Sequence, residues 1–489
     1  MRITFVYTDL ATDEPTYTGY FHHGIAALSA ILKKAGHQTS FIQLTKEISE
    51  EEFQKKVKIL TPDLIGFSCT THVFPFVKKY ARAAKKAINV PIICGGVHPT
   101  ICPEEVIEDE NIDIICRGEG DLAMVELCQK MENGQPIEDI QNLWVKKEGN
   151  ISKNELRPLI ADLDELPFPD REIFDYPNLN LEKKGIGTFM FSRGCPYQCT
   201  FCCESTLRKL YPNSQHYHRI RSPQSVVAEI KEVIKKYSFI KFVRLDDDLL
   251  FARLDWLKEF VPLYKREVGL PFSSDIRVNL MTEEILSLLK EAGVHLLRVG
   301  VESGNDYILK EVLNKGITVE QIKKAFNAAR KNNIKIQAYN MVGLPGESPK
   351  EILGTIKLNA EIKADLSVVS IFYPYKGTYL HDFCVKKRYF KEDAELPRNY
   401  YSYSVLTLPT IRREQISFFF HYFHFLKRVY GFLFKLPFSR LLVFLADKFF
   451  SFKYVPEIVK ITLNPLRAAT RLLRQRFHSG KAFDTESIG

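Results

Sequence analysis

The chain has 489 residues, 45% hydrophobic and 26% charged, a composition typical of globular proteins and a length that predicts two to four domains. Ten cysteines in so long a chain exclude a disulfide scaffold. The net charge is +9, but residues 411–480 hold 13 Lys/Arg against 3 Asp/Glu, so the basicity belongs to the tail and not to the rest of the chain.

The first segment, MRITFVYTDL, lacks the basic start and the apolar run of a signal peptide. We therefore expect a cytoplasmic protein in a reducing compartment, where clustered cysteines bind metals more often than they form disulfides.

Residues 1–135 alternate short β-branched segments with amphipathic ones. We expect strands at 2–8, 37–44, 63–70, 91–97 and 112–118, with helices between them, and hence a Rossmann-like parallel sheet wrapped by helices. Ligands of such sheets bind at the carboxyl ends of the strands. Small and polar residues gather at those ends: Ser68, Thr70, Gly95, Gly96, His98, Gly118 and Glu119.

Residues 136–182 differ in character and are predicted to be a linker lying across a surface. The piece NLWVKKEGN resembles a hairpin. Pro167 and Pro169 interrupt the acidic stretch that follows, so it cannot continue a helix or a central strand.

Residues 183–390 contain a second alternation of strands and helices. The expected strands lie at 188–193, 240–247, 272–279, 296–303, 334–344 and 366–374. Six βα repeats in this length predict an open partial barrel, because a complete (βα)₈ barrel needs eight repeats and about 250 residues. We again expect chemistry at the carboxyl ends of the strands.

Four cysteines follow the first of these strands in the stretch SRGCPYQCTFCCES. Cys195, Cys199 and Cys202 can direct three thiolates at one object. Zinc usually takes four ligands, and His216 and His218 could complete such a site. A [4Fe–4S] cluster with three cysteines keeps one iron open, as a reactive cluster requires. Cys203 is interpreted as a small buried residue rather than as a fourth ligand.

CPYQCTFC resembles the C-x3-C-x-aromatic-C motif of the radical S-adenosylmethionine (radical SAM) superfamily, with Phe201 as the aromatic residue. The resemblance implies that S-adenosylmethionine chelates the open iron and is cleaved by an electron from the cluster to a 5′-deoxyadenosyl radical. It also implies an electron donor such as flavodoxin or ferredoxin. The barrel would shield the radical from solvent.

Residues at the other strand ends are also expected to bind S-adenosylmethionine on the strength of this resemblance. Each has a structural alternative: an acidic turn, a salt bridge or a tight turn. The expected residues, besides Phe201, are Asp247, Arg277, Glu302, Gly343, Pro345 and Gly346.

The linear order of residues 1–380 resembles the cobalamin-binding subfamily of radical SAM enzymes. The small residues after the N-terminal strands match its cobalamin positions, where glycine allows a corrin face to approach the backbone. The D-x-H-x-x-G motif, which supplies a histidine to cobalt in many cobalamin domains, is absent after the first strand, and His22 and His23 are spaced differently. Cobalamin could bind without a protein imidazole, or the domain could bind nothing.

If cobalamin binds, the resemblance implies methylation of an unactivated carbon, with a lipid-like substrate as one option. The alternatives are cyclisation or oxidation by a radical SAM enzyme without cobalamin, and a zinc-stabilised RNA-binding protein.

Residues 391–489 are expected to form a basic, aromatic helical region. The longest uncharged run, ISFFFHYFHFL, is too short for the ~20 residues that span a bilayer. The tail either packs its aromatic residues on the barrel or lies on anionic lipid at the inner membrane face through residues 411–480. Binding of nucleic acid is the weakest alternative.

Overall fold

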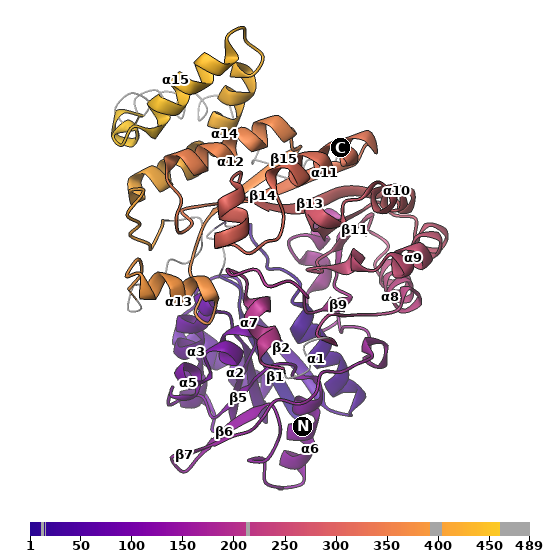
Figure 1. Ribbon diagram of the computed structural model, residues 1–489. Coiled ribbons are helices and arrows are strands. Elements are labelled where there is room, and N and C mark those ends of the chain that lie inside the picture. The colour runs from indigo at the N-terminus through magenta and orange to yellow at the C-terminus, as the bar shows by residue number, and fades with distance from the viewer. Residues whose placement is uncertain (11–13, 15, 212–215, 392–402, 460–489) are drawn as a thin grey trace, which may run out of the picture.

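The computed structural model describes residues 1–10, 14, 16–211, 216–391 and 403–459. Two open sheets dominate it (Figure 1). The N-terminal sheet and its helices form one body, and the second sheet with its helices forms another, above it in that view.

The first sheet has the order β2-β1-β3-β4-β5-β6-β7. Its five parallel strands are β1 (Arg2–Thr8), β2 (Gln38–Leu44), β3 (Leu64–Ser68), β4 (Ile92–Gly95) and β5 (Ile114–Cys116). The chain reverses its direction of travel across the sheet at β1, so the crevice between β1 and β3 is the expected ligand position of such a fold. The helices of this body are α1 (His23–Lys34), α2 (Glu50–Leu60), α3 (Phe74–Ala87), α4 (Val97–Ile101), α5 (Pro103–Ile107) and α6 (Asp121–Glu132).

The predicted hairpin piece extends this sheet beyond residue 135. Strands β6 (Leu143–Lys147) and β7 (Asn150–Lys153) add to β5 in antiparallel pairing. Trp144 is sandwiched between cations, with Arg117 5.0 Å and Lys153 4.3 Å from its ring centroid. Assigning the whole of 136–182 to a linker was therefore wrong, because this hairpin pairs with the sheet edge.

The remaining linker is tied down by Arg171. Its guanidinium forms a buried ion pair with Glu229 (2.9 Å) and lies 5.1 Å from the Phe21 ring and 4.8 Å from the Phe189 ring. Phe21 precedes α1, whereas Phe189 ends the first barrel strand, so one side chain joins both bodies.

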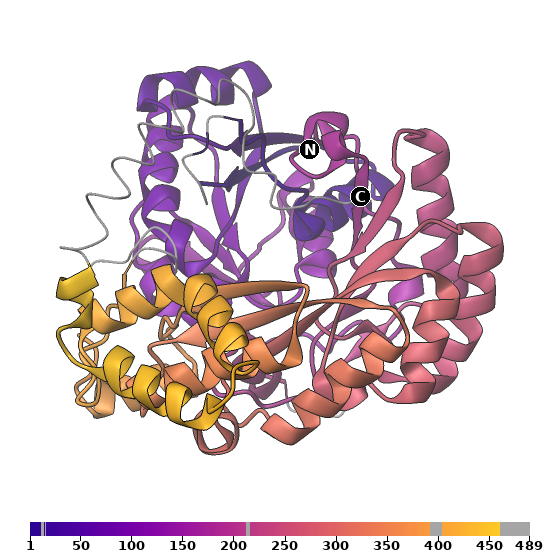
Figure 2. The same cartoon turned by 90° about the horizontal axis from the view of Figure 1, so that it is seen from above.

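The second sheet has the order β15-β14-β13-β12-β11-β8, with every pairing parallel. This confirms the fold class: a Rossmann-like body followed by an open (βα)₆ barrel. The strands are β8 (Ile186–Phe189), β11 (Phe242–Leu245), β12 (Phe272–Ile276), β13 (Val294–Glu302), β14 (Lys335–Val342) and β15 (Leu366–Ile371). The helices α8 (Pro223–Lys236), α9 (Leu254–Glu267), α10 (Glu283–Ala292), α11 (Val319–Lys331) and α12 (Pro349–Ile362) form an outer arc in Figure 2.

Short elements flank the cysteines. β9 (Ser192–Arg193) pairs with β10 (Arg219–Ile220), and α7 begins at the fourth cysteine (Cys203–Lys209). This ribbon and helix were not predicted, because two-residue strands carry no periodic signal in a sequence.

α13 (Tyr379–Lys386) precedes the C-terminal region, whose described part contains the helices α14 (Arg413–Leu433) and α15 (Ser439–Ser451) after a non-helical stretch at 403–412. α14 packs on α12 and β15, and α15 contacts α12 and α14. Within the described parts of the chain, no helix has both the length and the apolarity needed to cross a membrane. Residues 392–402 and 460–489 of the predicted tail lie outside the described residues.

A cavity between the two parallel sheets

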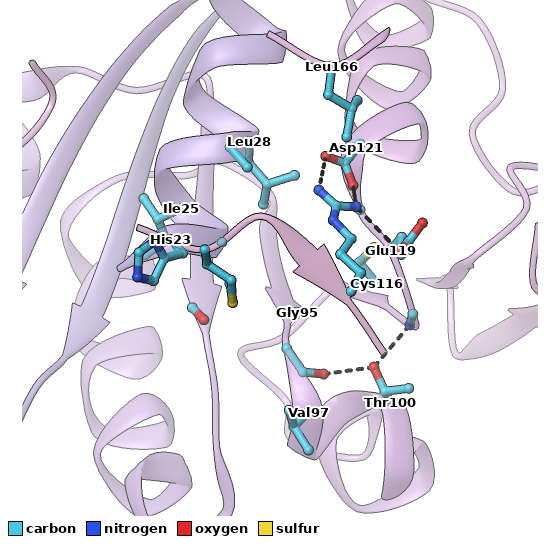
Figure 3. A pocket seen from close by; sticks show the side chains of 18 of the residues that line it. His23, Ile25, Leu28, Gly95, Val97, Thr100, Cys116, Glu119, Asp121 and Leu166 are labelled. Atoms are coloured by element: carbon cyan, nitrogen blue, oxygen red, sulfur yellow. Dashed lines mark hydrogen bonds and ion pairs between the residues drawn. The ribbon is translucent and has the colours of Figure 1, made fainter. Parts of the chain in front are cut away.

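A cavity of about 420 Å³ lies where the carboxyl ends of the first sheet face the cysteine loop of the barrel (Figure 3). Its size is that of a typical cofactor or small-molecule site. Three parts of the chain line it. They are the strand ends of the N-terminal body (Ser68, Gly95, Gly118), the linker (Leu163, Leu166, Pro167) and the loops around the cysteines (Arg193, Glu204, Tyr217).

The glycines at the strand ends give the cavity a floor of bare backbone. Gly96 has a φ of +108°, and a Cβ there would lie 2.8 Å from the carbonyl oxygen of Cys69. Gly118 has a φ of +70°, and its Cβ would lie 2.3 Å from the Tyr211 hydroxyl. The positive φ values and these close approaches therefore require glycine at both positions, and the backbone of both lines the cavity.

Five of the seven residues predicted for cobalamin line this cavity, and two do not. Thr70 is exposed beyond the end of β3. His98 is buried with its ring against Phe74 (4.8 Å between centroids) and Nδ1 3.4 Å from the Thr71 hydroxyl. Thr70 and His98 are therefore not among the residues that line this cavity. Ser68, Gly95, Gly96, Gly118 and Glu119 are the five that line it.

Two histidines that were set aside for their spacing also line the cavity. His22 caps α1: its Nδ1 accepts from the Ile25 N–H (3.1 Å), and its Nε2 lies 3.0 Å from the Ser68 hydroxyl. Burial lowers its pKa to about 4, so this ring is neutral. His23 Nε2 lies 3.6 Å from Asp246 of the barrel and has no hydrogen-bond partner among the described residues. Neither histidine belongs to a recognisable motif, because both lie many residues after the end of β1 in the sequence.

An ion-pair network closes one side of the cavity. Arg193 holds Asp121 with two hydrogen bonds (2.8 and 3.0 Å) and lies 3.3 Å from Glu119. Arg219 holds the same Glu119 through both of its terminal nitrogens (2.6 and 3.1 Å). Figure 3 shows Glu119 and Asp121 sharing one guanidinium. The acids follow β5 and the arginines form the β9–β10 ribbon, so the network ties the two bodies together.

The cysteine loop is fixed to the barrel by contacts around its three predicted ligands. Arg277 donates to Cys199 Sγ (3.4 Å) and stacks its guanidinium on the Tyr197 ring (3.5 Å). Thr200 donates to the carbonyl oxygen of Val312 (2.6 Å). Burial raises the pKa of Cys195 to about 11.

The loop geometry bears on the choice between zinc and a cluster. Among the described residues, no three His, Cys, Asp or Glu side chains are grouped to hold a single metal ion. His218, the zinc alternative, has its Nε2 at 2.8 Å from the carbonyl oxygen of Leu249. A [4Fe–4S] cluster needs more widely spaced thiolates, because each cysteine ligates a different iron.

One carboxylate oxygen of Asp247 holds the strand end that leads into the cysteine loop. Its buried Oδ1 accepts hydrogen bonds from the N–H of Phe191 (2.8 Å) and from the Ser192 hydroxyl (2.6 Å). Burial raises its pKa to about 7, and Oδ2 has no partner among the described residues. This placement favours the structural alternative considered for Asp247.

Two other predicted residues lie close to the cysteine loop. Glu302 ends β13 with a φ of +63° and forms a buried ion pair with Lys315 (3.0 Å). The same Lys315 ammonium lies 5.8 Å from the ring of Phe201, inside the cysteine motif. The carbonyl oxygen of Lys315 also accepts a hydrogen bond from Arg277. Lys315 therefore contacts all three predicted residues: Arg277, Glu302 and Phe201.

The predicted glycine turn after β14 is covered by α14. Gly343 and Gly346 have φ values of +82° and +83°, so both need glycine. A Cβ on Gly343 would lie 3.1 Å from Ile416 of α14, and Pro345 is buried. Glu347 accepts from the N–H groups of Gly343 (2.8 Å) and Leu344 (2.9 Å), and burial raises its pKa to about 8.

Glu204 is a cavity residue that the sequence analysis missed. It lies two positions beyond Cys202, in the first turn of α7, and one of its buried carboxylate oxygens has no partner among the described residues. Burial raises its pKa to about 7, and Asp248, another lining residue, adds to this effect. Only its helical position after the motif could have suggested a role.

Comparison with known proteins assigns both bodies. The B12 binding domain model matches residues 17–128, and the radical SAM superfamily model matches residues 189–358, which include the cysteine loop. These matches support the cluster over the zinc-stabilised RNA-binding alternative. A B12-binding domain and a radical SAM domain bind, respectively, cobalamin and a [4Fe–4S] cluster with S-adenosylmethionine.

Individual proteins resemble the chain over most of its length. An uncharacterized methyltransferase of Pyrococcus horikoshii is 28% identical over 81% of this chain and 84% of its own. The anaerobic magnesium-protoporphyrin IX monomethyl ester cyclase of Rubrivivax gelatinosus is 28% identical over 77% of this chain and 68% of its own. The fold is that of the radical SAM methyltransferase TsrM of Kitasatospora setae (TM-score 0.64, 16% identity, 79% of this chain and 75% of that one). The chain is a radical SAM enzyme that carries an N-terminal B12-binding domain.

Proposed function

We propose that this enzyme transfers a methyl group from cobalamin to an unactivated carbon of a small molecule. The observation that carries the proposal is the single cavity that has the glycine floor of the B12-binding domain on one side and the cysteine loop on the other. When bound, the cluster with S-adenosylmethionine supplies the radical that activates the substrate carbon, and cobalamin supplies the methyl group.

Different residues around this cavity would hold the cluster and the cobalamin. Cys195, Cys199 and Cys202 would hold the cluster, and Arg277 fixes the loop through Cys199 and Tyr197. Gly96 and Gly118, whose backbone lines the cavity and whose packing against Cys69 and Tyr211 requires glycine, would form the surface under the corrin. The buried Glu204 carboxylate oxygen, which has no hydrogen-bond partner among the described residues, could bind an amide group at the corrin edge.

His22 supports cobalamin binding without a protein imidazole beneath the cobalt. Both of its ring nitrogens are engaged, one by the Ile25 N–H and the other by Ser68. A ring held in this way caps α1 and has no lone pair left for a metal.

The walls of the cavity favour a substrate with an apolar part, as a lipid-like molecule has. Charged groups of the lining, among them Glu119, Arg193 and Glu204, lie near the ribbon and the cysteine loop. The apolar side chains that line it are Phe5, Ile25, Leu28, Ile93, Met124, Leu159, Leu163, Leu166, Met190, Phe191 and Leu207.

The proposal is tested by anaerobic purification and reconstitution. We expect about four irons per chain, a corrin absorbance, and formation of both 5′-deoxyadenosine and S-adenosylhomocysteine after a flavodoxin, a ferredoxin or a chemical reductant supplies the electron. Cys199→Ala should abolish deoxyadenosine formation, and Cys203→Ala is the matched control that should retain it. A variant without Cys199 that still makes deoxyadenosine would contradict the cluster assignment.

The cyclase-like similarity gives the second candidate, a ring-forming or oxidative reaction. S-adenosylmethionine labelled with deuterium in its methyl group separates the two. Methylation transfers the label to the product and forms S-adenosylhomocysteine. Cyclisation leaves the product unlabelled and forms deoxyadenosine without S-adenosylhomocysteine, which would contradict the methyl-transfer proposal while retaining the cluster.

A further inference from the structure

The C-terminal helices leave a large apolar surface open. α14 buries one face, including Phe419, Phe423 and Tyr430, against the barrel. In α15, all of whose residues are described, no residue is buried. Figure 1 shows α15 at the outer end of the molecule, on the far side of α14 from the barrel.

The side of α15 that faces the body is identified by its contacts. Asp447 accepts from Lys357 of α12 (2.6 Å) and from the Tyr430 hydroxyl of α14 (2.7 Å). The ring of Phe450 lies 6.5 Å from that of Phe418 and 6.4 Å from that of Tyr430. Val443 and Ala446 also pack toward the core, so these contacts define the inner side of the helix.

Six large apolar side chains in and beside α15 form what we call the outer apolar surface. Leu441, Leu445 and Phe449 follow one another at intervals of four, which places them on one stripe of the helix. Together the six expose roughly 700 Å², more than the largest patch on most monomers. The six side chains and their exposed fractions are Phe438 83%, Leu441 57%, Phe444 55%, Leu445 53%, Phe449 49% and Phe452 50%.

Cations border the outer apolar surface. Lys435, Arg440, Lys448 and Lys453 are all exposed. Asp447 and Glu457 are the acidic residues of 434–459, and they pair with Lys357 and Arg412. Within the described residues, no ion pair neutralises the four bordering cations. The ammonium of Lys448 lies 5.5 Å from the Phe444 ring, so charge and apolar area are interleaved.

We propose that the outer apolar surface docks on the interface of an anionic phospholipid bilayer. Apolar side chains enter the acyl boundary while lysine and arginine meet the headgroups, as in interfacial amphipathic helices. The charge argues for this occupant over a second copy of the chain, because two such surfaces face to face would oppose like charges. The inference does not rest on the proposed reaction.

The test uses flotation of the full-length enzyme with vesicles of phosphatidylcholine alone or with phosphatidylglycerol added. We expect binding to the anionic vesicles and roughly tenfold weaker binding by Phe444→Ser/Leu445→Ser. For Arg440→Gln/Lys448→Gln, the affinity for anionic vesicles should fall roughly fivefold per charge removed. Its affinity for neutral vesicles should not change. Ile59→Ser is the matched control, since that side chain is 80% exposed on α2, in the other body.

Folding of each variant is checked by circular dichroism and by its cluster and corrin absorbance, which do not depend on lipid. Full-length enzyme that stays with the soluble fraction on anionic vesicles would overturn the proposal. Equal binding by Phe444→Ser/Leu445→Ser and Ile59→Ser would do the same. Self-association in light scattering that the same double variant abolishes, without vesicle binding, would assign the surface to a second copy instead.

Discussion

The buried pair of Arg171 and Glu229 allows a quantitative test of how the linker holds the two bodies. The charged atoms lie 2.9 Å apart, and the side chains are 5% and 1% exposed. At an effective dielectric constant of about 20, their attraction is about 6 kcal/mol. The desolvation of each charge, several kcal/mol, offsets most of that gain.

Arg171→Met leaves the Glu229 carboxylate buried without its counter-charge. Its second oxygen already lacks a partner among the described residues, so nothing compensates for the loss. We expect the free energy of unfolding to fall by about 3–5 kcal/mol. For a body of about 200 residues this corresponds to a melting temperature roughly 10 °C lower.

The double variant Arg171→Met/Glu229→Met separates the charge from the packing. Two apolar side chains of similar volume remove both desolvation costs, so most of the lost stability should return. Urea and thermal unfolding followed by circular dichroism give the three differences of the cycle. If the double variant is as unstable as the sum of the single ones, the pair is not coupled, and our account of this linker contact is wrong.

Three further predictions concern single positions. Gly96→Ala places a Cβ 2.8 Å from the carbonyl oxygen of Cys69. Cobalamin retention on gel filtration should therefore fall at least tenfold, with iron content unchanged. Unchanged retention would refute the role of the glycine floor in cobalamin binding. Glu347 has a folded pKa raised to about 8, so it takes up a proton on folding and its contribution to stability falls as pH rises from about 4.5 to 8. Glu347→Gln keeps an acceptor for the turn and should flatten that pH dependence by roughly 3–5 kcal/mol, and an unaltered slope would show that another group causes it. Lys315→Met leaves the Glu302 carboxylate without its ion pair, so S-adenosylmethionine binding measured by calorimetry should weaken roughly tenfold; unchanged affinity would place Glu302 outside that site.

The fold was predictable because its periodicity is strong. The strands of both sheets are short β-branched runs, and the helices between them carry apolar residues at helical spacing, as α3 and α11 show. The hairpin β6–β7 was recognised as a hairpin, but its partner was not. Pairing with β5 depends on which sheet edge lies open, and that is a property of the assembled fold.

The candidate site was predictable where a motif or a strand end fixes it, and not elsewhere. The cysteines were identified from their spacing, and the glycines at the ends of β4 and β5 from their place at strand ends and from the resemblance to cobalamin-binding enzymes. His22 and His23 were not identified, because the path of the chain between β1 and α1 decides whether they reach the cavity. Arg193 and Arg219 were missed because surface arginines usually carry no signal, and only the facing acids of the other body make them part of the site.

The ion pairs of Glu119 and Asp121 with Arg193 and Arg219 also restrain the distance between the end of β5 and the cysteine loop. Glu119 directly follows Gly118 of the glycine floor, and Arg193 stands two positions before Cys195 of the cysteine loop. The strand end proposed to hold cobalamin and the loop proposed to hold the cluster are therefore joined directly by these salt bridges. If the end of β5 or the β9–β10 ribbon moves, these salt bridges must lengthen or the other element must move with it. If the two proposed sites hold cobalamin and the cluster, this network would keep the distance between them constant.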